Sequence, residues 1–248
     1  MSDCFCRVRL NVCTLYFISA CLILFSSTLT ASSGQAHLVI DANSGKTLSS
    51  RNANVLNHPA SLTKMMVLYA TFEALHSGRL NWRQNIVMSK RAARVIPFKL
   101  GVRAGKPLTV REAVMGMIVL SANDAAEAMC DHLSGTGRSC GAFLTRRARA
   151  IGMSRTTFTN GSGLPDKRQV TTARDMATLG LALQRDYPKE YALFATRSFK
   201  FRGASFAGTT TSCIDTRAWT GSRPASPMPP GSTSSPPSTT ADGTSSVW

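Results

Sequence analysis

The chain has 248 residues, enough for one large domain or two small ones around a buried core. Lysine and arginine number 29 against 13 aspartates and glutamates, which gives a formal net charge of +16. Such an excess predicts an anionic neighbour, whether nucleic acid, a membrane surface or an acidic polymer. No Cys-x-x-Cys or His-Glu-x-x-His spacing occurs, so we infer no metal site and no cofactor.

Residues 1–36 have the layout of a secretory signal peptide. Two arginines near the start precede a long, uncharged and mostly apolar run, and small residues follow it. Cleavage after Ala36 fits best, because Gly34 and Ala36 are small at the two positions that signal peptidase reads. An uncleaved membrane anchor and a lipoprotein cleaved before Cys21 are the alternatives.

Export to the periplasm or cell envelope excludes nucleic acid as the expected partner. The basic surface would instead meet an anionic envelope polymer or lipid headgroups at the membrane periphery. Four of the seven cysteines lie in the leader. Of the others, Cys130 and Cys140 could pair after export, and we expect two free thiols instead.

The mature chain begins with a predicted β-hairpin, because β-rich "LVI" is followed by the turn "DANSGK" and a short return. Helices then follow where apolar residues recur every three or four positions, with Thr109, Asp124 and Thr172 as expected N-caps. The predicted helices cover residues 60–77, 110–120, 125–133, 141–151 and 173–186. Residues 197–203 alternate in the manner of a strand.

The composition changes near Gly203. From Ala204 to Trp248 serine, threonine, proline and glycine dominate and no amphipathic period remains, which predicts a disordered tail. The ordered part is therefore expected to span residues 37–203. Its order of strands, a helix-rich stretch and a strand indicates an α+β fold.

Ser61 and Lys64 form the first candidate catalytic pair. They lie three residues apart at the start of a predicted helix, so both side chains share one face. The helix dipole favours negative charge developing on the Ser61 hydroxyl, and apolar surroundings favour a neutral lysine that can act as a base. Taken alone, the spacing also fits a helix N-terminus with a lysine that reaches along the surface to solvent.

Ser121 and Asn123 form the second candidate element. The segment Ser121-Ala122-Asn123 interrupts two predicted helices, so both side chains can project from the turn into a cleft. There a hydroxyl could relay a proton and an amide could hold a substrate backbone. The alternative is a serine and an asparagine that only cap the helices.

These residues together resemble the serine DD-peptidases, the low-molecular-mass penicillin-binding proteins that act as D-alanyl-D-alanine carboxypeptidases. The resemblance runs from about Ala36 to Gly203 and includes "HPASLTKMM", "MIVLSANDAAEAM", "TNGSGLPD" and "TTARDMATLGLAL" in the same order and spacing. It implies a sheet flanked by helices, a helical subdomain beside it and an active site between them.

The resemblance also implies roles for the candidate residues. Ser61 would attack the penultimate D-alanine carbonyl of a peptidoglycan stem peptide, and Lys64 would accept its proton. Ser121 would pass a proton to the leaving D-alanine, and Asn123 would hold the substrate amide. β-Lactams would acylate the same serine and leave slowly.

The family's Lys-Thr-Gly motif does not occur in this sequence. In the family its lysine binds the substrate's terminal carboxylate, and the strand supplies one of two oxyanion-hole donors. Losing one such donor costs on the order of a hundredfold in rate. The resemblance thus implies a partial catalytic domain over residues 37–203 that lacks its C-terminal strands, and an activity in doubt.

Three alternatives remain beside a DD-carboxypeptidase. A class A β-lactamase relative would need a Glu-x-x-x-Asn-type deacylation loop, which we do not find in the right place. A non-catalytic remnant that binds penicillin or peptidoglycan fits the missing motif directly. A basic surface-binding protein would require the whole motif set to be coincidence.

We further expect the residues after about Gly208 to be read in the wrong frame. Codons can be chosen for "GTTTSCIDTRAWTGSRPA" that, started two bases later, read "HNNLMHRYEGVDGIKTG". That sequence restores the family's missing Lys-Thr-Gly in register. The alternative is an ordinary tail rich in serine, threonine and proline.

Overall fold

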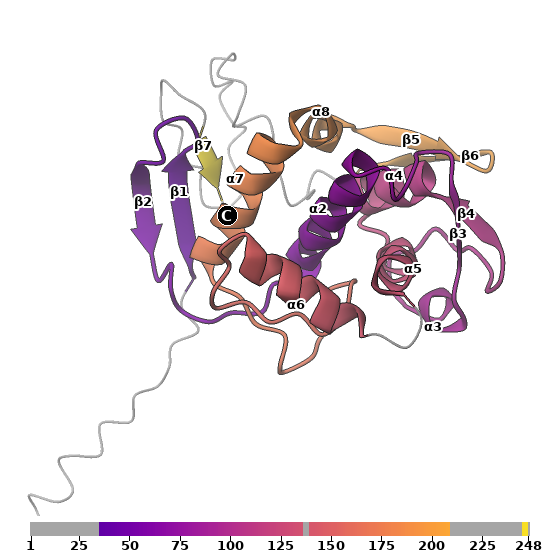
Figure 1. The fold of residues 1–248 in the computed structure, drawn as a ribbon, viewed down its shortest axis with the longest axis horizontal. Coiled ribbons are helices and arrows are strands. Elements are labelled where there is room, and N and C mark those ends of the chain that lie inside the picture. The colour runs from indigo at the N-terminus through magenta and orange to yellow at the C-terminus, as the bar shows by residue number, and fades with distance from the viewer. Residues whose placement is uncertain (1–34, 136–138, 209–244, 248) are drawn as a thin grey trace, which may run out of the picture. The chain divides into compact units, whose positions relative to one another are not determined.

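A computed structural model describes residues 35–135, 139–208 and 245–247 (Figure 1). Residues 1–34 of the predicted signal peptide, and the tail between residues 209 and 244, lie outside the described residues. The elements in chain order are β1 (His37–Asp41), β2 (Thr47–Arg51), η1 (Ala60–Leu62), α2 (Thr63–His76), β3 (Asn85–Val87), α3 (Lys90–Ala93), β4 (Pro107–Thr109), α4 (Val110–Leu120), α5 (Asn123–Ser134), α6 (Cys140–Ala150), α7 (Ala173–Asp186), α8 (Pro188–Tyr191), η2 (Ala192–Ala195), β5 (Ser198–Phe201), β6 (Ala204–Ala207) and β7 (Ser245–Val247).

The predicted N-terminal hairpin is confirmed and belongs to an antiparallel sheet of order β2-β1-β7. Asp41 closes the turn, because its Oδ1 accepts hydrogen bonds from the backbone N–H of Asn43 and Ser44. Leu38 and Ile40 point from β1 into a small core that includes Ala177 of α7. Helix α7 therefore covers one face of this sheet (Figure 1).

Helix α2 is the centre of the helical part, with α5, α6 and α7 packed against it (Figure 1). It is buried almost all round, from Thr63 at its start to Ala74 near its end. A helix enclosed by others has no solvent-facing stripe, which explains why apolar residues occur on every side of it. This arrangement confirms the α+β fold, with a helical body beside a small sheet.

Helices α4 and α5 meet at the turn that contains Ser121. The capping box that starts α4 is confirmed: Thr109 Oγ1 accepts from the Glu112 N–H at 3.1 Å, and the Glu112 carboxylate accepts from the Thr109 N–H at 2.8 Å. Asp124 does not cap α5 as expected, since Ala122 is the N-cap. Its carboxylate instead binds the backbone N–H groups of Leu100 and Gly101.

The expectation of two free thiols is wrong. Cys130 on α5 and Cys140 at the start of α6 form a disulfide, with their Cα atoms 5.5 Å apart. The two helices pack side by side and bring the thiols together, which the sequence alone did not reveal. The bond ties α6 to the helix that follows the Ser121 turn.

The predicted boundary between ordered chain and tail at residue 203 is also wrong. Residues 204–207 form β6, which pairs with β5, and the rings of Phe199 and Phe206 stack 5.6 Å apart. The N–H of Gly208 still donates to Arg197 O at 2.7 Å. At the far end of the expected tail, Ser245–Val247 form β7 against β1. Pairing with β5 and the packing of Phe206 thus extend the ordered chain beyond residue 203.

None of the described helices is both long enough and apolar enough to span a membrane.

Candidate active site

Ser61 and Lys64 meet at the start of the central helix. Ser61 lies in the single turn of 3₁₀ helix that leads into α2, and Lys64 lies in the first turn of α2. Lys64 Nζ is 3.3 Å from Ser61 Oγ, within hydrogen-bonding distance. Lys64 is only 3% exposed. A buried amine beside a hydroxyl is the arrangement that activates a serine as a nucleophile.

The loop of residues 159–164 provides the second contact of this lysine. Lys64 Nζ donates to the carbonyl oxygen of Ser162 at 2.6 Å. Because the amine is held between a hydroxyl and a carbonyl, its direction is fixed relative to Ser61 Oγ. The sequence predicted this segment as a loop but did not predict that it would contact the lysine.

The same loop presses against the backbone before the serine. A Cβ atom on Gly163 would lie 1.8 Å from the carbonyl oxygen of Ala60. Gly163 also has a φ of +85°, which strains any other residue. Ala60 itself has a φ of +45°, so the backbone enters the Ser61 turn in an uncommon conformation. Such strain at a non-glycine residue often accompanies a functional site.

One side chain of the loop, Asn160, and one beyond it, Gln169, hold the shape of the loop. Asn160 Oδ1 accepts from the Gly163 N–H at 2.8 Å, and Gln169 Oε1 accepts from the backbone N–H of Thr159 at 3.1 Å and of Asn160 at 3.3 Å. These bonds keep the Ser162 carbonyl directed at the lysine. The polar run "TNGSG" was the sequence signal for this turn.

Ser121 lies in the turn between α4 and α5, and Asn123 is the first residue of α5. Asn123 Nδ2 donates to the Pro97 carbonyl at 2.7 Å, and its backbone N–H donates to the Phe98 carbonyl at 2.7 Å. Ser121 is half-buried and adopts a left-handed conformation, with φ of +55°. The side chains of Ser61 and Lys64 are thus hydrogen-bonded to each other. Asn123 instead forms hydrogen bonds with the backbone at residues 97–98.

A cavity of about 300 Å³ opens beside Ala60, the residue that precedes Ser61. Its wall is formed by His58 and by loop residues between 163 and 169. Hydrogen bonds from Arg168 hold the pKa of the Asp166 carboxyl well below its usual range, so this wall carries a fixed negative charge that is paired with Arg168. No group of three or more histidine, cysteine, aspartate or glutamate side chains in the described part of the chain is placed to hold a metal ion.

Comparison with known proteins defines the class to which this fold and site belong. The D-alanyl-D-alanine carboxypeptidase family matches residues 25–219. The chain therefore belongs to this family of serine DD-carboxypeptidases, the class predicted from its motifs.

Individual proteins that resemble the chain are D-alanyl-D-alanine carboxypeptidases as well. The chain is 32% identical over 189 residues to the D-alanyl-D-alanine carboxypeptidase DacA of Haemophilus influenzae, covering 75% of this chain and 48% of the relative. It is 34% identical over 175 residues to DacA of Escherichia coli K12, covering 68% and 43%. The chain thus spans about half the length of these curated relatives.

Solved structures show the same fold. The crystal structure of the D-alanyl-D-alanine carboxypeptidase DacD from Francisella tularensis matches with a TM-score of 0.66 and 32% identity, over 75% of this chain and 45% of that one. Penicillin-binding protein D2 from Listeria monocytogenes, in its ampicillin-bound form, matches with a TM-score of 0.62 and 28% identity, over 71% and 72%.

Proposed function

We propose that the site performs the acyl transfer of a serine D-Ala-D-Ala carboxypeptidase. The observation that carries the proposal is the buried Lys64 amine 3.3 Å from the Ser61 hydroxyl. Ser61 Oγ attacks the carbonyl carbon of the penultimate D-alanine while neutral Lys64 takes the hydroxyl proton. The peptide C–N bond then breaks, the terminal D-alanine leaves with a proton on its nitrogen, and water hydrolyses the acyl ester on Ser61.

Ser121 and Asn123 complete the proposal as supporting groups. Ser121 passes the proton from Lys64 to the leaving nitrogen, and Asn123 holds the substrate amide from the first turn of α5. Asn123 Nδ2 already donates one hydrogen bond to Pro97 O, which fixes its side chain without using its oxygen in that bond. The amide oxygen of Asn123 is the acceptor that we assign to the substrate N–H.

The missing Lys-Thr-Gly sets the expected level of activity. Without its strand, the backbone N–H of Ser61 is left as one oxyanion donor of the usual two, and nothing in the motif set replaces the carboxylate-binding lysine. We therefore expect slow turnover of stem peptides. A protein that binds penicillin or peptidoglycan without turnover is the second candidate, favoured by the same absence from the sequence.

Penicillin labelling tests the proposal. The full chain is incubated with a fluorescent penicillin, and the adduct is placed by mass spectrometry of its peptides. We expect one adduct on Ser61, absent in Ser61→Ala and retained in the matched variant Ser77→Ala, which lies at the other end of α2. An adduct that persists in Ser61→Ala would refute the assignment, and a wild-type chain that never labels would favour the non-catalytic remnant.

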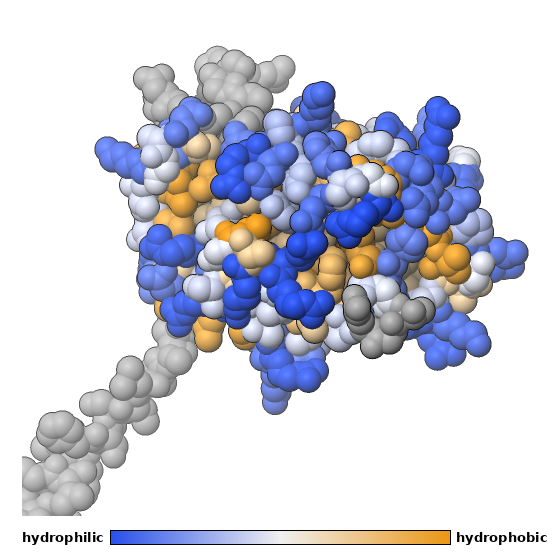
Figure 2. All heavy atoms as spheres, viewed as in Figure 1, coloured by the Kyte–Doolittle hydropathy of each residue, from blue (hydrophilic) through white to orange (hydrophobic). Residues whose placement is uncertain are grey.

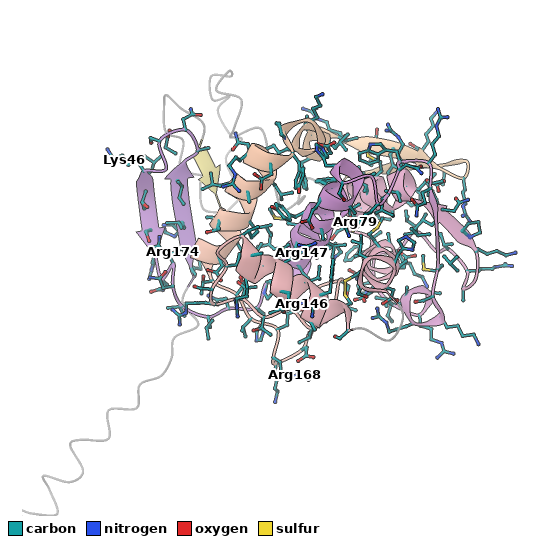
Figure 3. All side chains as sticks on the ribbon, viewed as in Figure 1. Lys46, Arg79, Arg146, Arg147, Arg168 and Arg174 are labelled. Atoms are coloured by element: carbon teal, nitrogen blue, oxygen red, sulfur yellow. A yellow bond between two sulfur atoms is a disulfide. The ribbon has the colours of Figure 1, made fainter. Side chains whose placement is uncertain are left out.

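We also propose that the exported chain associates with phosphate-bearing anions of the envelope, lipid headgroups at the membrane periphery being the expected source. Basic side chains gather on one face, where Arg79, Arg146 and Arg147 are labelled in Figure 3. These three arginines line a cavity of about 420 Å³, and hydrophilic side chains cover most of this face (Figure 2).

Vesicle sedimentation tests this association. The full chain should pellet with vesicles that contain anionic phospholipid and not with neutral ones, and added salt or inorganic phosphate should release it. The double variant Arg79→Gln/Arg146→Gln should pellet less. Equal pelleting with neutral and anionic vesicles would contradict the proposal.

A further inference from the structure

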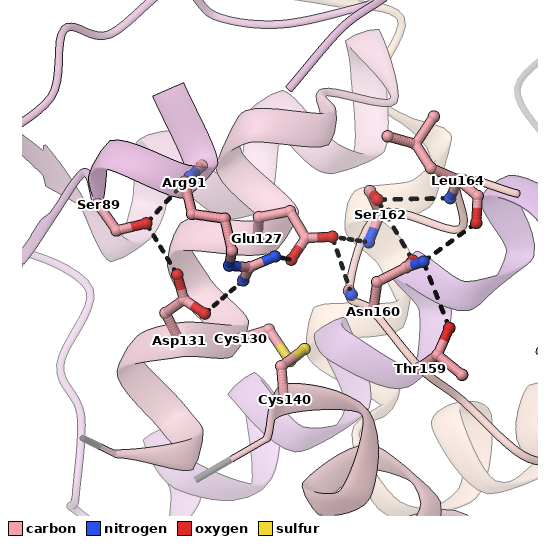
Figure 4. Close-up of polar contacts among 12 residues, drawn as sticks. Ser89, Arg91, Glu127, Cys130, Asp131, Cys140, Thr159, Asn160, Ser162 and Leu164 are labelled. Carbon is pink, nitrogen blue, oxygen red and sulfur yellow. Dashed lines mark hydrogen bonds and ion pairs between the residues drawn. A yellow bond between two sulfur atoms is a disulfide. The ribbon is translucent and has the colours of Figure 1, made fainter. Parts of the chain in front are cut away.

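Glu127 is a buried carboxylate in contact with the lysine-binding loop. It lies on α5 and its side chain is 2% exposed. Its Oε1 accepts hydrogen bonds from the backbone N–H of Gly161 at 3.1 Å and of Ser162 at 2.9 Å (Figure 4). Neither the motifs nor the family's catalytic pattern assigns this residue a role.

Charged side chains of α3 and α5 surround the carboxylate of Glu127. Arg91 of α3 forms an ion pair with Glu127 Oε2 at 2.6 Å and also binds Asp131, one turn further along α5 (Figure 4). Asp131 in turn accepts from the hydroxyl of Ser89 at 2.8 Å. A buried carboxylate is destabilising unless it is paired, so Arg91 makes the charge at this position tolerable.

The loop lies directly on α5 at this point. A Cβ on Gly161 would lie 2.9 Å from Cys130 Cβ and 3.0 Å from the carbonyl oxygen of Ala126. Cys130 is fixed by its disulfide to Cys140. Two kinds of contact therefore fix the backbone at residues 161–162. Gly161 packs closely on α5, and the two backbone N–H groups donate to one oxygen of Glu127.

Ser162, one of the two residues held by Glu127, is also the residue that orients the catalytic lysine. The N–H of Ser162 donates to Glu127, while the carbonyl of the same residue accepts from Lys64 Nζ at 2.6 Å. A shift of the Ser162 backbone would move the acceptor of Lys64 and with it the direction of the amine toward Ser61 Oγ. Displacements of about 1 Å in a catalytic group can cost on the order of a hundredfold in rate.

We propose that Glu127 is a positioning residue of the active site, which fixes Ser162 so that its carbonyl aims Lys64 at Ser61. The catalytic part of this inference rests on the proposed acyl transfer. The mechanical part, that Glu127 fixes the Gly161–Ser162 backbone, rests on the contacts above. Packing alone needs no carboxylate at position 127, whereas two convergent N–H donors and a guanidinium need an acceptor with two oxygens.

The first experiment separates substrate binding from acylation. Penicillin acylation of the full chain is measured over a range of drug concentrations, which gives an apparent binding constant and a first-order acylation rate. Glu127→Ala should slow the acylation rate about 10- to 100-fold with little change in binding. Glu127→Gln should also slow it, because one amide oxygen cannot serve both Arg91 and the loop.

The matched control is Asp131→Asn, which perturbs Arg91 but leaves both loop contacts of Glu127 in place. It should acylate within a few-fold of wild type. Circular dichroism establishes that each variant is folded at the assay temperature. If Glu127→Ala does not fold, Glu127→Gln, which keeps the shape of the side chain, is used in its place to test the proposal. A folded Glu127 variant with a wild-type acylation rate would overturn the proposal, as would a loss confined to binding.

The second experiment does not depend on activity. Amide hydrogen exchange is followed by NMR at Gly161 and Ser162, with Thr157 and Val170 as internal references because they bond to each other and not to Glu127. Exchange at 161 and 162 should rise at least about tenfold in the Glu127 variants and stay unchanged at 157 and 170. If the wild type is never acylated but these amides respond, the proposed function fails while the positioning stands; unchanged exchange would refute the positioning itself.

Discussion

Gly163 and Ala60 approach each other so closely that no side chain fits between them. A Cβ on residue 163 would lie 1.8 Å from the Ala60 carbonyl oxygen and 3.1 Å from the Ser61 nitrogen. The loop that binds Lys64 therefore also limits where the candidate nucleophile can sit. One glycine thus couples two segments about a hundred residues apart.

Substituting Gly163 should disturb both stability and the site. We expect Gly163→Ala to lower the free energy of unfolding by about 2 kcal/mol or more, because it combines a steric clash with a strained φ. Gly78→Ala is the control, since Gly78 has a φ of +70° but open space around it. Urea unfolding should show the larger loss for Gly163→Ala and penicillin labelling should fall only there. Equal losses of stability would show that the clash is relieved by a small backbone movement.

Removing the lysine should stop acylation without unfolding α2. Lys64→Ala deletes the base but keeps a strong helix former, so helix content by circular dichroism should be preserved. Penicillin acylation, followed by intact-protein mass spectrometry, should fall at least about 100-fold. Lys189→Ala, which alters an exposed lysine, should acylate like wild type. Normal acylation by Lys64→Ala would exclude this residue as the base.

The disulfide should contribute measurably to stability. Closing a loop of this size, with a sequence separation of 10, is worth about 3 kcal/mol in the chain-entropy account. The double variant Cys130→Ser/Cys140→Ser should lose about that much in urea unfolding. A reducing agent should destabilise the wild type to the same level and leave the double variant unchanged. A reductant effect in the double variant would point to other thiols.

Asp186 should make a small, acid-sensitive contribution. Hydrogen bonds from Arg185 lower the pKa of Asp186, burial opposes this shift, and the Tyr69 hydroxyl lowers the pKa further. Because the folded-state pKa lies below the unfolded value of about 3.9, this stability is present above about pH 4 and is lost as the pH falls through the folded-state pKa. Urea unfolding should therefore show wild type more stable than Asp186→Asn at pH 7, with the gap closing in acid. A gap independent of pH would contradict this.

The reading frame beyond Gly208 should be recoverable from the gene. We expect the actual codons, read two bases later, to give His-Asn-Asn-Leu and then Lys-Thr-Gly. Inserting one base or deleting two near codon 208 should restore a soluble, penicillin-binding carboxypeptidase, at least about a hundredfold faster in acylation because the second oxyanion donor returns. Stop codons or unrelated sequence in that frame would show that the present tail is native.

Local features of this protein were well predicted from sequence because short-range physics decides them. The Thr109–Glu112 capping box and the Thr172 cap both form, since cap hydrogen bonds join residues three apart. The Ser61–Lys64 pair also forms, because residues at that spacing share a helix face. Asp124 was assigned wrongly as a cap because a distant loop at 100–101 competes for its carboxylate.

The sequence by itself thus determined the α+β order of elements, the helix starts and the pairing of a serine with a lysine. Only the tertiary structure decided which residues act on that pair from afar: Gly163 against Ala60, the Ser162 carbonyl on Lys64, and Glu127 beneath the loop. It also decided the Cys130–Cys140 bond and the ordering of β6 by β5. Apart from the β5–β6 hairpin, whose strands are adjacent in sequence, these contacts join distant segments. They exist only once the helices have packed and brought the distant groups within hydrogen-bonding or bonding distance.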